Sequence, residues 1–341
     1  MREEQERREM EYLSPFAAKS ASTKGRETSH EKCPIRTEFQ KDRDRITHSK
    51  AFRRLMHKTQ VFISPEGDHY RTRLTHTLEV AQIARTVSRA LRLNDDLIEA
   101  IALGHDLGHT PFGHTGEDAI SKLLPDGFRH NEQSVRVVRH LENDGQGLNL
   151  THEVEDGILN HRTACLPSTL EGRVVQICDK IAYMNHDVDD ALRAKLLVPS
   201  DLPRAVSSML GPTPAKRIDF LVKNLVEHSL ACINAGKTVE AKVSLSPDVA
   251  RAMQNLRTFL FENVYATQLQ AKERAKIQDM LRLLFEHYMA NPHKMPLEIR
   301  AIYEKSKHQA VADYIACMTD RFAAKCFREI FIPASWNVME G

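Results

Sequence analysis

The sequence predicts an all-α fold. Apolar residues recur at three- and four-residue spacing through most of the 341 residues, and no segment shows the alternation typical of a half-buried strand. Hydrophobic residues make up 41% of the chain, which is enough for one large core or two coupled cores. We therefore divide the chain into an irregular N-terminal lead-in (1–45), a central helical domain (46–200) and a C-terminal helical region packed on that domain (201–341).

The lead-in shows the weakest helical pattern. Residues 13–45 are rich in serine, threonine and charge, which is typical of irregular segments on the surface. The first strong helical stripe follows later, where apolar residues recur from Val80 to Leu91. This stripe places His76 in the first turn of an amphipathic helix.

Two further helices are predicted around the segment "GHDLGHTPFGH" (104–114). Asn94 is a favourable N-cap for a helix that carries Ile98, Ile101 and His105 on one face, and we expect Gly108 to end it. "TPFG" then forms a turn. Thr115 is expected to cap a short helix that bears Glu117.

A longer helix is predicted over residues 171–194. Val175, Asp179 and His186 fall on one of its faces, with Tyr183 and Asp187 alongside. Beyond residue 200, helical stripes continue, for example from Ile277 to Phe285 and from Val311 through Met318 to Phe322. These stripes indicate a helical C-terminal lobe.

Four of the residues on interior helix faces form a pattern typical of a metal site. They are His76, His105, Asp106 and Asp179. Imidazole and carboxylate ligands drawn from three helices suit a divalent ion, and the sequence does not choose among Mn²⁺, Mg²⁺, Fe²⁺ and Zn²⁺. A buried, unpaired Asp179 among apolar neighbours would cost several kcal/mol, and a cation removes that cost.

Composition points to a reducing compartment. The six cysteines are scattered and form no CxxC pair, which argues against a disulfide framework and a zinc ribbon. The N-terminus "MREEQERREMEY" has no apolar core of a signal peptide, and no apolar run approaches the length of a membrane span. We expect a cytoplasmic protein that does not enter the membrane.

Several motifs resemble the HD-domain phosphohydrolases, and specifically their deoxynucleoside triphosphate triphosphohydrolase (dGTPase-like) branch. The motifs are "HSKAFRRLMHKTQVF", "RTRLTHTLEV", "GHDLGHTPFGH", "DKIAYMNHDVDDA" and "VADYIACMTDRFA". The H…HD…D pattern marks only the superfamily, whereas the extension GHTPFGH and the flanking motifs are far more specific. The resemblance runs from about Leu13 to Phe322. One departure is Cys317, where a glycine is expected.

The resemblance implies a reaction and a role for each site residue. Water attacks the α-phosphorus of a dNTP, and the products are the deoxynucleoside and tripolyphosphate. His114 is the best candidate to protonate the leaving oxygen, with Glu117 holding its other ring nitrogen. The remaining matches are assigned by the part of the substrate they face: His109 and His130 to the α-phosphate, Arg73, Lys180 and Tyr183 to general substrate contacts, and Gln60 and Asp187 to the 3′-hydroxyl.

Two alternatives remain open. The same metal site could serve a nucleoside monophosphate, a cyclic nucleotide or an alarmone, although the GHTPFGH and KTQVF elements argue against these substrates. A nucleic-acid-binding regulator would use basic runs such as "RDRITHSKAFRRLMHK", but the net charge of only +2 weakens this reading. We interpret Arg53 and Arg54 as ion-pair partners of the "DRDR" segment. Weak ssDNA binding, an allosteric dNTP site and the base preference stay open, and the resemblance suggests a homo-oligomer, often a hexamer.

Overall fold

The computed structural model describes residues 1–60, 71–236, 243–265 and 268–333. Within these ranges the regular elements are helical, and extended pairing is confined to two isolated bridges. This confirms the all-α prediction. The helices are α1 (Arg2–Tyr12), α2 (Glu38–His48), α3 (Lys50–Arg54), α4 (Arg73–Leu91), α5 (Asp95–Gly104), α6 (Gly113–Ser121), α7 (His130–Arg136), α8 (His152–Leu159), α9 (Leu170–Arg193), α10 (Arg204–Leu210), α11 (Pro214–Asn234), α13 (Pro247–Leu260), α14 (Gln268–Ala290), α15 (Leu297–Tyr303), α16 (Lys307–Ala316) and α17 (Asp320–Phe331).

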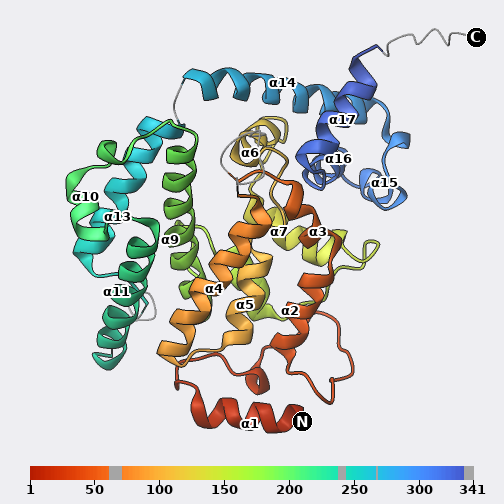
Figure 1. The fold of residues 1–341 in the computed structure, drawn as a ribbon. Helices are drawn as coiled ribbons and strands as arrows, with labels where there is room; N and C mark the ends of the chain where they lie inside the picture. The colour runs from red at the N-terminus through yellow and green to blue at the C-terminus, as the bar shows by residue number, and fades with distance from the viewer. Residues whose placement is uncertain (61–70, 237–242, 266–267, 334–341) are drawn as a thin grey trace, which may run out of the picture.

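Helices α4, α5 and α9 form the centre of the protein (Figure 1). Helices α2 and α8 pack against α5, and α11 packs against both α4 and α9. The predicted stripe of α5 is buried, with Ile98 and Ile101 fully inside. Asn94 caps this helix as predicted, because its side chain accepts a hydrogen bond of 3.2 Å from the Leu97 amide. The central helices therefore bury the face from which His76, His105 and Asp179 were expected to project.

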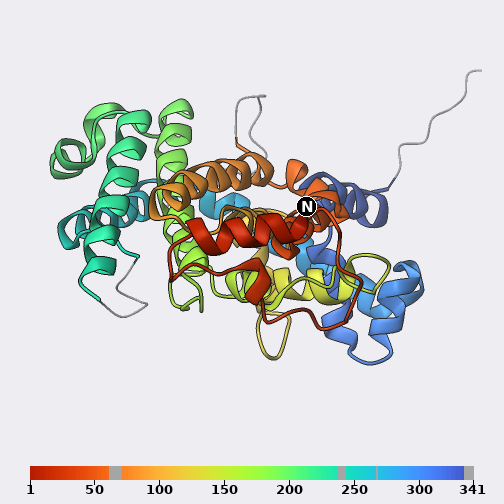
Figure 2. The ribbon, with the colours of Figure 1, turned by 90° about the horizontal axis from the view of Figure 1, so that it is seen from below.

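The C-terminal helices divide into two groups on opposite sides of this centre. Helices α10, α11 and α13 lie beside α9, whereas α14 leads across to α15, α16 and α17 (Figure 1). Figure 2 shows the same separation from below, with α1 crossing beneath the central helices. The first group shares the main apolar core, and the second forms a separate core that α6 joins through Ile120. The segment that follows the histidine-rich motif thus packs on the C-terminal helices.

The N-terminal lead-in is more regular than the sequence analysis predicts. Both α1 and α2 lie inside the range 1–45 that was expected to be irregular, at least in part. Helix α2 begins with a capping box, in which Thr37 and Gln40 each bond the other's backbone amide. Arg26 also binds this helix, through an ion pair of 2.8 Å to Glu38 and a second one to Asp42. The prediction was wrong because it relied on the polar composition of this segment. The capping residues Thr37 and Gln40 mark the start of a helix and were not used.

Two predicted boundaries around the histidine-rich segment were also wrong. Helix α5 ends at Gly104 and not at Gly108. A side chain at Gly108 would lie 2.1 Å from the Ser134 amide, so this glycine permits close approach to α7 instead of ending a helix. Helix α6 begins after Phe112, and Thr115 lies within its first turn rather than capping it.

The C-terminal stripe from Val311 to Phe322 is interrupted. Helix α16 ends at Ala316, and Thr319 starts α17 by accepting a hydrogen bond of 3.2 Å from the Phe322 amide. The break turns the Phe322 side chain outward, where 43% of it is exposed. Cys317, where the resemblance leads us to expect glycine, is half-buried in the turn between the two helices.

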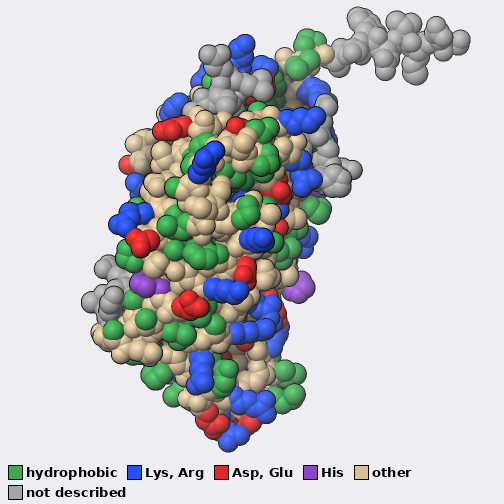
Figure 3. Space-filling view, turned by 60° about the vertical axis from the view of Figure 1, so that its left-hand side comes forward, with side chains coloured by type: hydrophobic (Ala, Val, Ile, Leu, Met, Phe, Trp, Pro, Cys, Tyr) green, Lys and Arg blue, Asp and Glu red, His purple; other side chains and the backbone are tan. Residues whose placement is uncertain are grey.

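The surface carries charges of both signs. On the face shown in Figure 3, lysine and arginine side chains are interspersed with aspartate and glutamate.

Arg54 forms an ion pair of 3.2 Å with Glu142 and not with the "DRDR" segment, whereas Arg53 donates to the His48 carbonyl. None of the described helices combines the length and apolarity that a bilayer span requires.

Candidate metal centre and catalytic histidines

The four predicted metal ligands converge between α4, α5 and α9. His76 lies in the first turn of α4, His105 and Asp106 directly follow α5, and Asp179 lies in the middle of α9. The ligand atoms of His76, His105 and Asp106 lie within 4.8 Å of one another. Asp179 Oδ1 is 3.1 Å from Nε2 of His76 and 3.8 Å from Nε2 of His105. The structure therefore brings together residues that are up to 103 positions apart (179 minus 76).

His105 has the orientation that a metal ligand needs. Its Nδ1 donates a hydrogen bond of 2.7 Å to the Ala102 carbonyl, which leaves a lone pair on Nε2. That Nε2 is buried and has no hydrogen-bond partner in the described part of the chain. It faces Asp106 Oδ1 at 3.4 Å. The imidazole nitrogens and carboxylate oxygens gathered here fit a divalent cation, which would satisfy the orphaned atom.

The carboxylates of the centre are held in their ionised form. Burial opposes the charge on Asp106, yet His105, His109 and the Arg73 guanidinium hold its pKa well below the usual range. Burial opposes the charge on Asp179 too, and the hydrogen bond from His76 together with His105 lowers its pKa to about 2. A buried carboxylate at Asp106 and a half-buried one at Asp179 that both keep their negative charge are suited to bind a cation.

Glu117 links His114 and His130, which together with His109 form the candidate catalytic cluster. Its Oε2 lies 3.2 Å from Nδ1 of His114 and 2.9 Å from Nδ1 of His130, and its Oε1 accepts the His130 amide at 3.0 Å. Burial opposes ionisation, but both imidazoles keep the Glu117 pKa far below its normal value. The His114 side chain is 78% exposed, so its free edge can meet a substrate. Glu117 thus orients both rings from one carboxylate.

The sequence analysis missed His161. This buried residue approaches His130, with 3.1 Å between the two Nε2 atoms, and its ring lies edge-on to His105, with 5.0 Å between centroids. Its Nδ1 donates to the Ile158 carbonyl at 2.7 Å, and burial lowers its pKa to about 3. A neutral His161 therefore offers an acceptor to His130. It connects the candidate catalytic cluster with the candidate metal centre.

His109 lies between the same two groups. Its ring stacks on His130 with 4.0 Å between centroids, and its Nε2 is 3.4 Å from Asp106 Oδ1. Burial, together with the nearby charges of Arg73 and His130, lowers the His109 pKa well below the usual value. A positively charged His109 ring is therefore disfavoured. A neutral ring still donates one hydrogen bond.

Asp187 lies two turns beyond Asp179 on α9 and is buried. Its Oδ2 accepts a hydrogen bond from the Tyr265 hydroxyl, while its Oδ1 has no partner among the described residues. Burial raises the Asp187 pKa to about 7 and Asp190 acts in the same direction, whereas the Tyr265 hydrogen bond and His114 act to lower it. The sequence analysis did not identify Tyr265. One carboxylate oxygen is left free to accept from a ligand.

A small cavity is lined in part by Lys180 and Tyr183, which follow Asp179 on α9. It has a volume of about 200 Å³, and the cations that line it are Arg173, Lys180 and Arg257. Tyr183 also lines it, and burial raises the pKa of its phenol to about 12. Lys180 and Tyr183 were predicted as substrate contacts, whereas Arg173 and Arg257 were not. A cavity lined by three cationic side chains suits a ligand that carries several negative charges.

Arg73 and Gln60 contact each other next to Asp106. Arg73 is buried and donates a hydrogen bond of 2.8 Å to Asp106 Oδ2, so it contacts a candidate metal ligand directly. Its other terminal nitrogen lies 3.5 Å from the Gln60 carbonyl. The side-chain Oε1 of Gln60 is buried without a described partner. Neither residue lines the cationic cavity.

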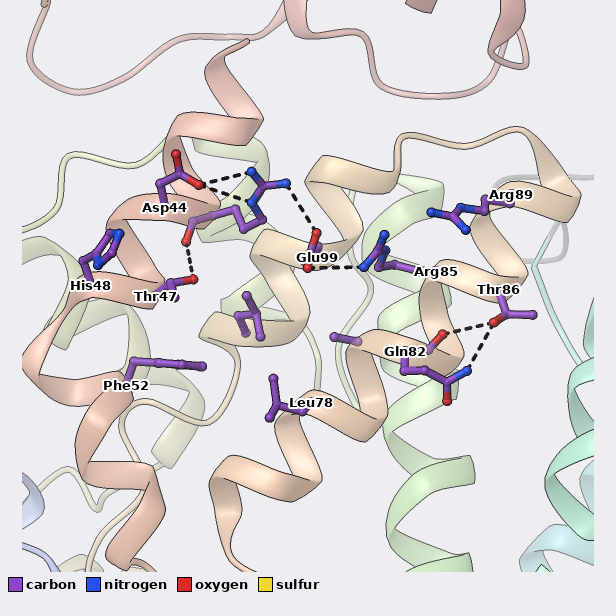
Figure 4. Close-up of a pocket in the computed structure, with 13 residues that line it drawn as sticks. Asp44, Thr47, His48, Phe52, Leu78, Gln82, Arg85, Thr86, Arg89 and Glu99 are labelled. Carbon is purple, nitrogen blue, oxygen red and sulfur yellow. Dashed lines mark hydrogen bonds and ion pairs between the residues drawn. The ribbon is translucent and has the colours of Figure 1, made fainter. Parts of the chain in front are cut away.

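A second groove lies on the outer surface between α2, α3, α4 and α5. Its volume is about 570 Å³, and Phe52, Leu78 and Arg85 are among the residues that line it (Figure 4). The charged side chains at its rim pair with one another, as Arg85 does with Glu99 at 3.5 Å. None of the predicted site residues lines this groove. The candidate site is therefore the buried centre and not this larger surface depression.

Residues 73–184 match the HD domain family, and residues 243–329 match the phosphohydrolase-associated domain. The first match contains all four converging ligands, so the fold and the site define an HD-domain phosphohydrolase. Full-length relatives narrow the family further. The chain is 58% identical to a deoxyguanosinetriphosphate triphosphohydrolase-like protein of Caldanaerobacter subterraneus subsp. tengcongensis, over 98% of this chain and 97% of the relative. The chain belongs to the deoxyguanosinetriphosphate triphosphohydrolase-like family.

Other relatives with the same name agree. The identity is 50% to the protein of Clostridium perfringens, over 94% of each chain, and 46% to that of Desulfatibacillum aliphaticivorans, over 98% of each chain. Among solved structures, a hypothetical protein from Aquifex aeolicus aligns with a TM-score of 0.46 and 18% identity, over 84% of this chain and 69% of the other. That likeness is too distant to support an argument.

Proposed function

We propose that the protein is a metal-dependent hydrolase that cleaves dNTPs at the α-phosphate, with the deoxynucleoside and tripolyphosphate as products. One observation carries the proposal. Along α9, the candidate metal ligand Asp179 is followed by Lys180 and Tyr183, which line the cationic cavity, and then by the buried carboxylate of Asp187, whose Oδ1 has no described partner. This order provides for a phosphate chain, a sugar ring and a sugar hydroxyl in turn.

The chemistry divides between the metal and the protein. A bound divalent ion supplies charge neutralisation and an activated water. His76, His105, Asp106 and Asp179 would hold it. Around that ion, the cations of the cavity bind phosphate oxygens, and the neutral His109 donates a hydrogen bond toward the reacting phosphate.

The leaving 5′-oxygen needs a proton, and His114 would provide it. This ring is exposed to solvent, while its Nδ1 lies 3.2 Å from Glu117 Oε2. Glu117 keeps its negative charge because its pKa is held low by His114 and His130, despite its burial. A fixed carboxylate behind the imidazole favours the protonated form that donates.

Product analysis tests the reaction class. The protein is incubated with each of the four dNTPs and Mn²⁺ or Mg²⁺, and the products are separated by anion exchange. We expect equal amounts of deoxynucleoside and tripolyphosphate. Release of orthophosphate or pyrophosphate, or turnover confined to monophosphates, cyclic nucleotides or alarmones, would contradict the proposal. The same assay measures the base preference.

Asp187 is expected to select substrates with a 3′-hydroxyl. A 2′,3′-dideoxynucleotide leaves its buried Oδ1 unpaired, so kcat/KM should fall by a factor on the order of 10² or more relative to the matching dNTP. Asp187→Ala should shrink this discrimination. The control is Asp189→Ala, since Asp189 lies on the same helix but pairs with Arg71 at 3.0 Å. If wild type and Asp187→Ala discriminate equally between the dNTP and its dideoxy analogue, Asp187 does not contact the 3′-hydroxyl.

A further inference from the structure

The backbone that carries the catalytic histidines is unfavourable by itself. His109 lies in the turn between α5 and α6, and His114 is the second residue of α6; between them, Phe112 has a φ of 61° and Gly113 a φ of 56°. The left-handed region is unfavourable for a bulky residue such as Phe112, because its Cβ lies too close to the following carbonyl oxygen. Contacts from elsewhere in the protein must therefore hold this turn in place.

Asp320 makes the contact at the strained position. It is buried, and it is the first residue of α17 in the second C-terminal group. Its Oδ1 accepts a hydrogen bond of 2.9 Å from the Phe112 amide. Its Oδ2 accepts two bonds from Thr59, at 3.0 Å from the amide and 2.8 Å from the hydroxyl. The Asp320 carboxylate thus bonds both the turn that follows His109 and the segment at Thr59, next to Gln60.

Lys58 forms a second connection one residue away. Its Nζ is buried and donates to two carbonyls, that of His109 and that of Ala316 at the end of α16, the latter at 2.8 Å. Its own carbonyl accepts the Arg73 amide at 3.1 Å, at the start of α4. Residues of the α16–α17 turn therefore connect to His109 through Lys58 and to Phe112 through Asp320. Lys58 also bonds the start of α4, the helix that carries His76.

Helix α16 fixes the other histidine-bearing element in the same way. Asp313 is fully buried and accepts hydrogen bonds from two residues of α7, at 3.0 Å from Gln133 and 2.7 Å from Arg136. Helix α7 carries His130 at its first position. The motif "VADYIACMTDRFA" thus contains two carboxylates that bind the two elements of the catalytic cluster.

We propose that Asp320 is a positioning residue for hydrolysis, which holds the turn bearing His109 and His114 in its reactive geometry from the C-terminal helices. This inference rests on the proposed function, because it assigns those histidines to the reaction. It gives the phosphohydrolase-associated region a role in catalysis that does not require it to touch the substrate. Displacement of a catalytic group by about 1 Å can lower a rate about 100-fold.

The test is Asp320→Asn in the full chain. The amide keeps one acceptor oxygen and presents donors where the carboxylate accepted, so Phe112 or Thr59 loses its partner. We expect kcat for dNTP hydrolysis to fall about 10- to 100-fold, with KM and metal content unchanged. Hydrogen–deuterium exchange of residues 107–116 should become about tenfold faster or more, since a charge-assisted bond to a buried amide is lost.

Glu153→Gln is the matched control. Glu153 is also a buried carboxylate in the first turn of a helix, and it accepts from the Lys24 amide at 2.8 Å and the Thr23 hydroxyl at 2.7 Å. It should lose comparable thermal stability while kcat stays at the wild-type value. If both variants lose kcat equally, Asp320 contributes only to stability and the inference is overturned.

The exchange measurement separates this inference from the proposed function. Should the wild type hydrolyse no dNTP, the proposed function fails, and faster exchange of residues 107–116 in Asp320→Asn still supports the restraint. Unchanged exchange there overturns the inference whatever the activity. If Asp320→Asn does not fold, Thr59→Val removes only the hydroxyl donor, and it should lower kcat several-fold without changing KM. A wild-type kcat in that variant also counts against Asp320.

Discussion

Replacing Asp106 with alanine is expected to abolish both metal retention and turnover while the helical fold persists. The Asp106 carboxylate is the group on which the centre converges: Oδ1 faces His105 and His109 at 3.4 Å, and Oδ2 accepts the Arg73 guanidinium at 2.8 Å. Without it, the remaining ligands lose the charge that offsets the desolvation of a divalent ion. Most of the fold, in contrast, depends on apolar packing of the central helices.

The measurement combines metal content, turnover and far-ultraviolet circular dichroism on one preparation. Asp106→Asn is the companion variant, because its amide oxygen still accepts from the buried Arg73 while the negative charge is gone. Both variants should lack metal and activity, and Asp106→Asn should retain more thermal stability. Full turnover by either variant, or by wild type treated with a chelator, would show that the reaction does not need the metal.

Local sequence signals were sufficient for the central helices. The apolar stripe of α9 predicted its buried face, and Asn94 predicted the start of α5. These local signals did not predict the backbone conformation where contacts with distant segments determine it. Phe112 adopts a left-handed conformation that no propensity favours, because Asp320 binds its amide from a helix more than 200 residues later (320 minus 112). Gly108 resembles a helix end, but α7 approaches it instead.

The site was predictable to the extent that its residues occur in compact motifs. The four metal candidates and the His114 and Glu117 pair lie in such motifs, and the structure brings each set together. His161, Arg257 and Tyr265 stand alone in their segments, where a single polar residue usually has an ordinary structural role. Only the packing of α8 and α13 around α9 reveals that they face the site.

Removing the His114 imidazole is expected to lower kcat by about 10² to 10⁴, the usual range for a lost general acid, without loss of metal. The exposed ring contributes little to stability, so the fold should be unaffected. Glu117→Gln should be less damaging, because its amide oxygen can still accept a hydrogen bond from one of the two histidines that Glu117 orients. Loss of metal in His114→Ala would instead identify His114 as a ligand.

A substrate with sulfur in place of the bridging 5′-oxygen isolates the role of the proton. A thiolate leaves without protonation, so the sulfur analogue does not need a general acid, whereas the ordinary dNTP does. The loss of kcat caused by His114→Ala should therefore be large for the dNTP and small for the analogue. His140→Ala, at an exposed histidine in the helical turn after α7, serves as the control and should leave both rates unchanged. Equal losses on the two substrates in His114→Ala would mean that His114 binds the phosphate chain and that the leaving oxygen takes its proton from another group.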